Sequence, residues 1–411
     1  MLKMRKMKAS GIEWIGEIPE GWEVVPVKRL CTMQAGKNLT SEQIAPEGTY
    51  PVYGGNGIRG FFSDYNCDGQ FLTVGRQGAL CGNVHKINGK VWATEHAVIT
   101  TPSSYTTLDF LYYLLIGMDL NQYVSSTAAQ PGLAVGTLLN LKTCYPCSTL
   151  EQTQISNYLN AKCSEIDDLL TSVRSSIEEY KKLKQTVITQ AVTKGVRGER
   201  EMKDSGVEWI GEIPAEWKIC PLKRLASIQT GSTPSKNSSE KFYSTNGIPW
   251  IKPNNLGFSY SIEKTAEFIS LDANSNAHIM PPKTVYVGCI GSRIGNSGYS
   301  LISCSCNQQI NALIFNQHMF WKYGWYLTIS QEPQYMLLAN GNVIHIINST
   351  TQGNISCVVP ALVEQKEIAD YLDAKYAEID KLIAKKEQLI KELESYKKSL
   401  IYEVVTGKRE V

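Results

Sequence analysis

Two long segments of the chain share one pattern of apolar and polar positions. Near the C-terminus the apolar positions fall at steps of three and four residues: Ile368, Leu372, Ile379, Leu382, Leu389 and Leu393. An earlier segment carries the same pattern at Ile155, Leu159, Ile166, Leu169, Val173 and Tyr180. Such steps place one apolar stripe along a helix and are typical of a coiled-coil seam. The pattern predicts two long helices, over residues 148–200 and 362–411.

Both segments carry helix start and stop signals. Ser148 and Glu151 have the spacing of a capping box, and Gly195 and Gly407 stand where the glycine after a helix belongs. A helix of about 43 residues is roughly 65 Å long, and its single apolar stripe needs a partner. We expect the two helices to pair with each other, the alternative being that each stripe packs on its own domain.

Sequence similarity shows that most of the chain consists of two copies of one unit. SGIEWIGEIPEGW (10–22) returns 195 positions later as SGVEWIGEIPAEW (205–217), and LEQTQISNYL (150–159) returns 213 positions later as VEQKEIADYL (363–372). The second copy therefore holds 18 additional residues, which the match of VGRQGALCGN (74–83) to VGCIGSRIGN (287–296) places before position 287. A period of this length indicates a duplicated domain rather than a solenoid.

In each copy the Trp-rich opening is followed by a segment rich in short β-type runs and Asn-Gly turns, over about 31–146 and 226–360. Residues 110–116 and 321–329 read as short helices within them. The predicted fold is α/β (α+β), with two mixed domains joined by two long antiparallel helices in a pseudo-twofold arrangement. The expected boundaries are 1–147 and 201–361 for the domains and 148–200 and 362–411 for the helices.

Composition narrows the class of protein. The chain has 411 residues with a formal net charge of +2, which is far from the basic balance of a protein that grips DNA by charge alone. Eleven cysteines without a framework spacing, and no apolar core of a signal peptide, favour a reducing, cytoplasmic location. The sequence contains no run of about 18 apolar residues, so it predicts no membrane span.

Motifs of catalysis are missing from the sequence. We find no phosphate-binding loop, no glycine-rich loop for S-adenosylmethionine (SAM) and no HExxH zinc motif, so we expect neither catalytic nor metal-binding residues. Cys144 and Cys147 have the spacing of a redox pair, but the second copy keeps only Cys357. Glu364 and Lys366 have a spacing found in nucleases, yet a carboxylate at a helix start needs no catalytic explanation.

Polar groups suited to reading bases are common in the two domains. Arginine suits guanine edges and asparagine or glutamine suits adenine, although each such residue could equally be an ordinary polar loop group. The candidate DNA-binding residues are Asn56, Arg59, Arg76, Gln77, Asn83, His85, Lys86, Lys252, Asn254, Asn255, Arg293, Asn296 and Gln308.

The motifs together resemble the specificity (S) subunit of type I restriction-modification systems. The carriers are the paired SGxEWIGEIP openings, VYGGNG (52–57), GALCGNV (78–84), AAQPGL (128–133), TGSTPSK (230–236), NQQINA (307–312) and the paired EQ..I..YL starts of the helices. GNVIHIINSTTQGNI (341–355) matches the family pattern only loosely.

This resemblance implies that each domain is a target recognition domain that reads one half of an asymmetric, bipartite DNA site. The helices would set the spacer between the halves. The partners would be double-stranded DNA, two modification subunits that methylate adenine with SAM, and restriction subunits that use ATP and Mg²⁺, with no cofactor on this chain and no membrane. A stand-alone nuclease or methyltransferase, or a coiled-coil scaffold without sequence specificity, remains as an alternative.

Overall fold

The computed structural model describes residues 5–77, 81–124, 132–233, 243–244, 247–257, 261–262, 265, 267–270, 277–340 and 345–411. The chain divides into two compact units. Unit 1 comprises Met1–Arg174 with Glu387–Val411, and unit 2 comprises Ser175–Lys386. In the described part of the chain, none of the helices is both long and apolar enough to cross a bilayer.

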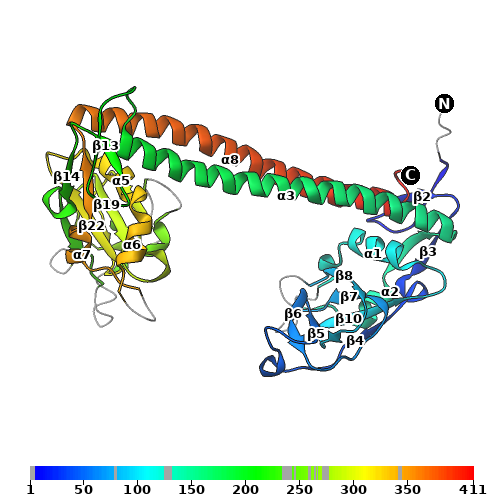
Figure 1. Ribbon diagram of the computed structural model, residues 1–411. Coiled ribbons are helices and arrows are strands. Elements are labelled where there is room, and N and C mark those ends of the chain that lie inside the picture. Colours follow the sequence, from blue (N-terminus) through cyan, green and yellow to red (C-terminus); the bar gives the residue numbers. More distant parts are fainter. Residues whose placement is uncertain are drawn as a thin grey trace. The chain divides into compact units, whose positions relative to one another are not determined.

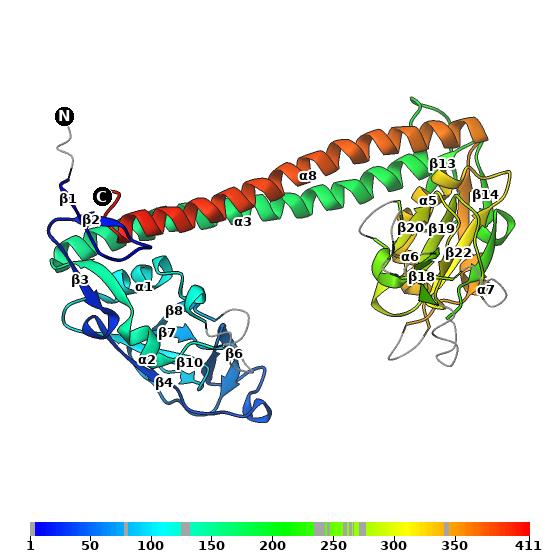
Figure 2. The ribbon, with the colours of Figure 1, turned by 180° about the vertical axis from the view of Figure 1, so that it is seen from behind.

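Unit 1 is built on a four-stranded antiparallel sheet. Its strands follow the order β4 (Cys31–Ala35), β10 (Ala97–Pro102), β7 (Gln70–Gly75) and β8 (Val84–Asn88). A smaller sheet has the order β6 (Gly57–Phe62), β5 (Tyr50–Gly54) and β9 (Trp92–Ala93). Helix α1 (Leu108–Gly117) packs on the main sheet, and Phe110, Leu111 and Leu114 are buried in the core there (Figures 1 and 2).

Unit 2 repeats this arrangement. Its main sheet has the order β15 (Ala226–Thr230), β22 (Ile310–Phe315), β19 (Thr284–Gly288) and β20 (Ser297–Ser300). The smaller sheet consists of β16 (Tyr243–Ser244), β18 (Phe268–Ile269), β17 (Ile248–Ile251) and β21 (Ser305–Cys306). Helix α5 (Trp321–Ser330) takes the place of α1. The duplication and the two short helices expected from the sequence are confirmed, and β16 and β18 lie within the longer stretch of the second copy.

Short elements connect each domain to its long helix. In unit 1 they are β1 (Met7–Ala9), β2 (Glu17–Pro19), β3 (Trp22–Pro26), α2 (Val135–Asn140) and β11 (Lys142–Pro146). In unit 2 they are β12 (Met202–Asp204), β13 (Glu212–Pro214), β14 (Lys218–Pro221), α6 (Glu332–Leu338), α7 (Ser349–Gly353) and β23 (Ser356–Val359). β3 pairs with β11 and β14 with β23, which brings Trp22 and Trp217 to the start of a long helix.

The long helices are α3 (Thr149–Lys194) and α8 (Leu362–Val405). They end earlier than the predicted segments because a glycine with positive φ follows each: Gly195 at 78° and Gly407 at 71°. After α8 the amide of Gly407 bonds the carbonyl of Val404 and that of Lys408 bonds the carbonyl of Glu403, which together make a Schellman motif. Residues 195–200 and 406–411 therefore lie outside the helices.

The two helices pack against each other in antiparallel fashion within each unit (Figure 1). In unit 1, Asp167 of α3 binds Lys397 of α8 at 2.6 Å, while Arg174 binds Glu394 at 2.7 Å. Residue numbers thus fall on α8 as they rise on α3. In unit 2, Lys184 of α3 pairs with Asp380 of α8 in the same sense. The predicted antiparallel pairing is confirmed.

The buried stripe on the helices differs from the predicted seam. On α3, Ile155, Ile166 and Ile177 are buried at steps of 11 residues, and Leu170 is 5% exposed whereas the predicted Leu169 is 53% exposed. An 11-residue step corresponds to about 3.67 residues per turn, close to a straight helix, whereas the prediction assumed the 3.5 of a supercoil. The heptad pattern therefore drifts off the stripe, and the assignment of Leu169 to the seam is wrong.

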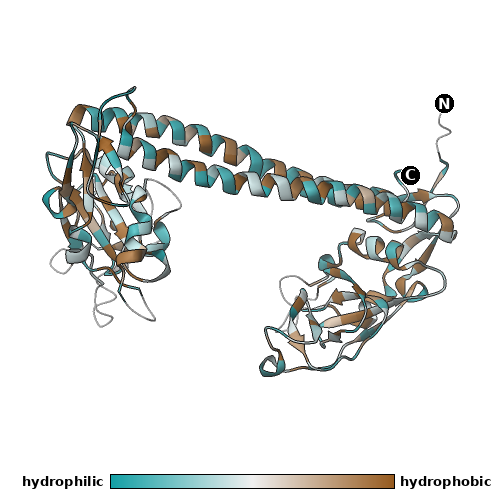
Figure 3. Cartoon of the chain, in the orientation of Figure 1, coloured by the Kyte–Doolittle hydropathy of each residue, from teal (hydrophilic) through white to brown (hydrophobic). Residues whose placement is uncertain are grey.

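The same drift affects α8, where the predicted seam residue Leu389 is 41% exposed. In Figure 3 both long helices alternate between hydrophilic and hydrophobic colours along their length, as a single stripe requires. The other predicted positions divide into two groups. Those that are buried are Ile155, Leu159, Ile166, Ile368, Leu372 and Ile379. Those that are half-buried are Val173, Tyr180, Leu382 and Leu393.

Candidate nucleic-acid interface

Three loops meet at one end of the main sheet of unit 1. They are the described residues 76–77 and 81–83 between β7 and β8 (here called the β7–β8 loop), the two-residue β5–β6 turn and the turn before β10. Backbone bonds close the first loop, from Gly75 to the carbonyl of Asn83 and from Gly82 to that of Gly75, both at 2.8 Å. A side chain at Gly55 would lie 2.9 Å from the carbonyl oxygen of Gln77, so the β5–β6 turn rests directly on the β7–β8 loop.

This junction brings together three of the predicted DNA-binding residues of unit 1. Asn83 donates its side-chain amide N–H to the side-chain oxygen Oδ1 of Asn56 at 2.6 Å. His85 follows two residues after Asn83, on β8, and lies against Gly57. A Cβ added at Gly57 would be 3.4 Å from the imidazole. Asn56 is exposed and the other two side chains are half-buried. The cluster offers hydrogen-bonding groups at a loop edge that another molecule can reach.

Other predicted residues of unit 1 have structural partners. Arg76 donates through Nε to the carbonyl of Leu133 at 3.2 Å, and Gln77 forms a β-bridge with Gly132. Both residues therefore tie the loop to the segment before α2. Arg59 is exposed on β6.

Lys86 lies on the opposite face of β8 from His85, because neighbouring side chains of a strand alternate. Its ammonium binds Asp109 at 2.6 Å and lies 4.5 Å from the ring centroid of Tyr112, both on α1. The structure thus places Lys86 in the packing between the sheet and α1, apart from the loop cluster.

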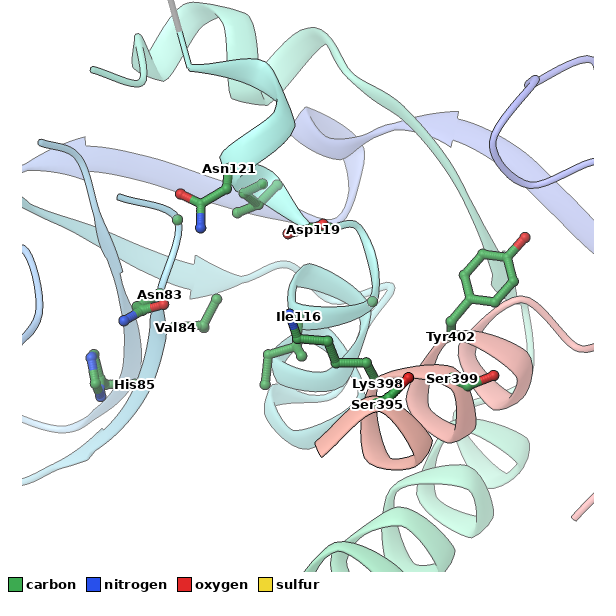
Figure 4. A pocket seen from close by; sticks show the side chains of 13 residues that line it. Asn83, Val84, His85, Ile116, Asp119, Asn121, Ser395, Lys398, Ser399 and Tyr402 are labelled. Atoms are coloured by element: carbon green, nitrogen blue, oxygen red, sulfur yellow. The ribbon is translucent and has the colours of Figure 1, made fainter. Parts of the chain in front are cut away.

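A cavity of about 630 Å³ opens beside the loop cluster, between the start of β8, the end of α1 and α8 (Figure 4). Its polar lining includes Asn83, His85, Asn121, Lys398 and Ser399. The Nε2 atom of His85 is buried and has no protein partner, and burial lowers the pKa of the imidazole below its usual 6.5. His85 is therefore neutral near pH 7. Within the described residues, no group of three or more His, Cys, Asp or Glu side chains is placed to hold a metal ion.

In unit 2 the corresponding loop keeps the asparagine, because Asn296 is the counterpart of Asn83, while the position of His85 is taken by Gly298. Asn296 lies against Gly257, where an added Cβ would be 3.1 Å from the amide nitrogen. Lys252 pairs with Glu267 and lies 4.9 Å from the ring centroid of Trp250. These contacts give Lys252 a local structural role.

Of the remaining predicted residues in unit 2, Asn255 caps a short 3₁₀ turn by accepting from the amide of Lys252 at 2.9 Å. Asn254 is exposed, and Arg293 is half-buried in the turn after β19. Gln308 is exposed and accepts a hydrogen bond from Thr233. Asn254 and Gln308 are thus the most accessible of the set.

The sequence interpretation missed the turn before the strand β10. Glu95 and His96 stand at its centre, with Glu95 Oε1 and His96 Nε2 3.1 Å apart. Gln309 occupies the position of His96 in unit 2, beside the predicted Gln308. The signal was present in the repeat, because the offset of 213 aligns NQQI at 307–310 with TEHA at 94–97.

The nuclease-like spacing at the start of α8 has a structural explanation. Glu364 accepts from the indole nitrogen of Trp217 at 2.9 Å and pairs with Arg200 at 2.6 Å. In unit 1, Glu151 accepts from Trp22 at 3.0 Å and pairs with Arg5. The carboxylate is therefore a repeated support of the helix start.

Comparison with known proteins is consistent with this repeated architecture. The family model described as the type I restriction modification DNA specificity domain matches residues 19–179 and 214–394, one match in each copy. The chain belongs to this family. Over 148 residues it is 42% identical to the type I restriction enzyme EcoprrI specificity subunit of Escherichia coli, an alignment that spans 35% of each protein.

A second relative aligns over nearly the full length of this chain. It is the type I restriction enzyme MjaVIII specificity subunit of Methanocaldococcus jannaschii, 25% identical over 418 residues, which cover 95% of this chain and 93% of the relative. A solved structure on complex assembly and conformational transition of the type I R-M system matches with a TM-score of 0.72 at 14% identity, covering 95% of this chain and 99% of that one. This structural likeness supports the fold.

Proposed function

We propose that the chain is the DNA-specificity subunit of a type I restriction-modification complex, in which each unit reads one half of an asymmetric, bipartite site. The observation that carries this proposal is the pair of specificity domains with equivalent backbones and different side chains at equivalent positions. His85 of unit 1, for example, is replaced by Gly298 in unit 2. Different side chains on a common frame suit two different half-sites.

The two long helices set the spacing between the half-sites in this proposal. Seven residues added to each helix would lengthen it by about 10 Å, which is about three base pairs of DNA. We expect a matched pair of seven-residue insertions, at the exposed central positions of α3 and α8, to lengthen the preferred spacer. An unchanged spacer in an assembled, active complex would exclude this role of the helices.

The chemistry belongs to partner subunits in this proposal. Modification subunits would supply SAM and methylate adenine, and restriction subunits would supply ATP- and Mg²⁺-dependent translocation and cleavage. The net charge of +2 supports a shared grip on DNA, because tight binding requires many phosphate contacts. We expect the isolated chain to bind DNA more weakly than the complex with modification subunits at the same salt concentration.

The stand-alone enzyme is less favoured, because a relative that aligns over nearly the whole chain is a specificity subunit and the nuclease-like carboxylate Glu364 is engaged by Trp217 and Arg200. A scaffold without specificity does not explain the differing loop side chains.

Methylated-base sequencing tests the proposal directly. The chain is expressed with a modification subunit in a host that lacks endogenous methylation, next to a host with the modification subunit alone. We expect a new bipartite motif with methylated adenine in both halves only when the chain is present. An unchanged methylome, with the complex shown to assemble, would refute the recognition role.

A further inference from the structure

One turn is built in the same way in both units and carries different side chains. In unit 1 it covers residues 94–97, closed by the bond from the amide of Ala97 to the carbonyl of Thr94 at 2.9 Å. In unit 2 it covers residues 307–310, closed from Ile310 to Asn307 at 3.1 Å. The central pair is Glu95 and His96 in the first turn, and Gln308 and Gln309 in the second.

Main-chain bonds hold both turns to the loop cluster. The amide of Arg76 donates to the carbonyl of His96 at 2.9 Å, and in unit 2 that of Cys289 donates to Gln309 at 2.8 Å. On the other side, Thr94 donates to Tyr53 at 2.9 Å. Asn307 donates to Ile251 at 3.0 Å in the equivalent place. Because these bonds use only backbone atoms, the turn keeps its position whatever side chains its centre carries.

In each unit one glycine packs closely against the backbone of this turn. A Cβ at Gly36 would lie 2.2 Å from the carbonyl oxygen of Ala93, and one at Gly231 would lie 2.3 Å from that of Cys306. Both distances are far inside van der Waals contact, so only glycine permits this approach. The two copies therefore share not only a fold but also the placement of this one turn.

The side chains at the centre differ in hydrogen-bonding capacity. In unit 1, Glu95 and His96 are half-buried with the carboxylate beside the imidazole, and the buried atoms Glu95 Oε2 and His96 Nδ1 have no protein partner. In unit 2, Gln308 and Gln309 each use the side-chain oxygen to accept, from Thr233 and Asn307. Among the described residues, neither glutamine amide nitrogen donates to the protein. The turn thus presents an acceptor in one copy and donors in the other.

We propose that the centre of this turn is a specificity-determining position in each domain, with Glu95 reading a C·G pair in one half-site and Gln308 with Gln309 reading an A·T pair in the other. A carboxylate accepts from the N4 amino group of cytosine. A glutamine donates its amide N–H to N7 of adenine and accepts from N6 with the second lone pair of its oxygen. His96 orients the Glu95 carboxylate through their contact. This inference rests on the function proposed above.

The neighbourhood of the turn fits this role. A Cβ at Gly55 would lie 3.6 Å from the carbonyl oxygen of His96, so the turn adjoins the β5–β6 turn that carries Asn56. Residues that both copies keep at this edge, such as Asn83 and Asn296, serve the common frame. Residues that differ on the same backbone are those able to distinguish two sequences.

The test exchanges the two central pairs. The first variant carries Glu95→Gln and His96→Gln, and the second carries Gln308→Glu and Gln309→His. Each new pair already occurs on this backbone in the other copy, so both variants are compatible with the fold. Glu47→Gln, at an exposed position of unit 1, is the matched control for loss of one carboxylate. The readout is the methylation motif of the complex with its modification subunits, determined on a randomised DNA library.

We expect the first variant to change the preference at one base pair of a single half-site from C·G to A·T by roughly tenfold or more. The second variant should make the reverse change in the other half-site only. Glu47→Gln should leave both halves unchanged. If the complex with the wild-type chain yields a motif and both variants yield that same motif, the inference is wrong and the proposed function stands.

Two other outcomes also decide. A variant that assembles with the modification subunits but yields no motif contradicts the inference, because the exchanged pair should read a base rather than prevent reading. An unmodified complex that assembles and yields no motif refutes the proposed function itself, and the inference falls with it.

Discussion

The indole nitrogen of Trp217 donates a hydrogen bond of 2.9 Å to Glu364, and Trp22 makes the same bond of 3.0 Å to Glu151. Each bond joins the Trp-containing opening of one copy to the first turn of its long helix. In unit 2, Arg200 also pairs with the carboxylate and lies 5.0 Å from the centroid of the Trp217 ring. The duplicated opening sequence therefore acts as a clamp on the helix start.

We predict unequal costs when the clamp is broken. The Glu364 side chain is 3% exposed and that of Glu151 is 27% exposed. Glu364→Ala leaves a buried indole N–H without its acceptor and removes one partner of the Arg200 guanidinium, which keeps its bonds to Glu216 and to the carbonyl of Lys194. It should therefore cost about 2 to 3 kcal/mol, whereas Glu151→Ala should cost about 1 kcal/mol. Hydrogen exchange of the first turns of α8 and α3 measures the two effects. Equal loss of protection in both variants would contradict the clamp as described.

Gly36 and Gly231, which pack against the backbone before the 94–97 and 307–310 turns, should be essential for the stability of their units. Gly36→Ala and Gly231→Ala would push a methyl group into a backbone carbonyl that cannot withdraw, and we expect a loss of about 1 to 3 kcal/mol or more for each. Gly21→Ala is the control, because nothing lies within 4 Å of its added Cβ. Urea unfolding followed by circular dichroism measures all three variants. A Gly36 variant as stable as the Gly21 variant would show that the approach is looser than the structure has it.

Much of the fold could be predicted from the sequence, because a duplicated sequence predicts two domains with the same backbone. Trp22 and Trp217, or Gly75 and Gly288, are the same residue in the same local sequence, so the sequence predicts equivalent backbones. Strand order could not be predicted in this way. The central places of β10 and β22 depend on long-range pairing, which short apolar runs alone do not encode.

The helix stripe shows a different limit of sequence reasoning. Steps of three and four residues occur in both straight helices and supercoils, and over 20 residues the two differ by a single position. Leu169 fits a heptad and Leu170 fits the 11-residue step, and both are apolar, so the sequence does not choose between them. Packing in the structure selects Leu170.

This choice can be tested at two adjacent positions. Leu170→Ala removes a side chain that packs in the core of unit 1, and it should cost about 2 to 4 kcal/mol. Leu169→Ala changes an exposed position and should cost less than about 1 kcal/mol. Thermal unfolding of the two variants provides the comparison. A larger loss for Leu169→Ala would restore the heptad seam.

The candidate site was predictable in residue type but not in orientation. Lys86 and His85 are neighbours in sequence and both suit nucleic acid, yet the pleat of β8 sends Lys86 to Asp109 and leaves His85 at the loop cluster. The sequence predicts Arg76 as a DNA-binding residue, and the structure gives its Nε atom a backbone partner, the carbonyl of Leu133. Such partners come from distant parts of the chain, which composition and spacing do not reveal.

Thiol chemistry should distinguish Cys147 from the buried cysteines. Burial raises the pKa of Cys144 and of Cys357 to about 12, whereas Cys147 is exposed although its pKa is also raised. Because the thiolate is the reactive form, iodoacetamide at pH 8 should label Cys147 well before Cys144 or Cys357. Mass spectrometry of the native chain measures the order, and Cys147→Ser should remove the fast label. Rapid joining of Cys144 and Cys147 by a mild oxidant would revive a redox role.

The buried imidazole of His85 should make the stability of unit 1 depend on pH. Burial lowers its pKa in the folded chain below 6.5, so between these two values the unfolded chain binds a proton that the folded chain does not. The free energy of unfolding should therefore fall as the pH drops below about 6.5 and be unaffected by this group above it.

The variant His85→Gln isolates the effect of this histidine. It removes the titrating group while keeping a polar side chain, so its stability should decline less than that of the unmodified chain between pH 7.5 and pH 5. The difference between the two curves cancels the contribution of the groups that both proteins share. Urea unfolding at several pH values gives the two curves. Parallel curves would mean that His85 has the same proton affinity in the folded and unfolded chain, and that solvent reaches the buried Nε2 atom.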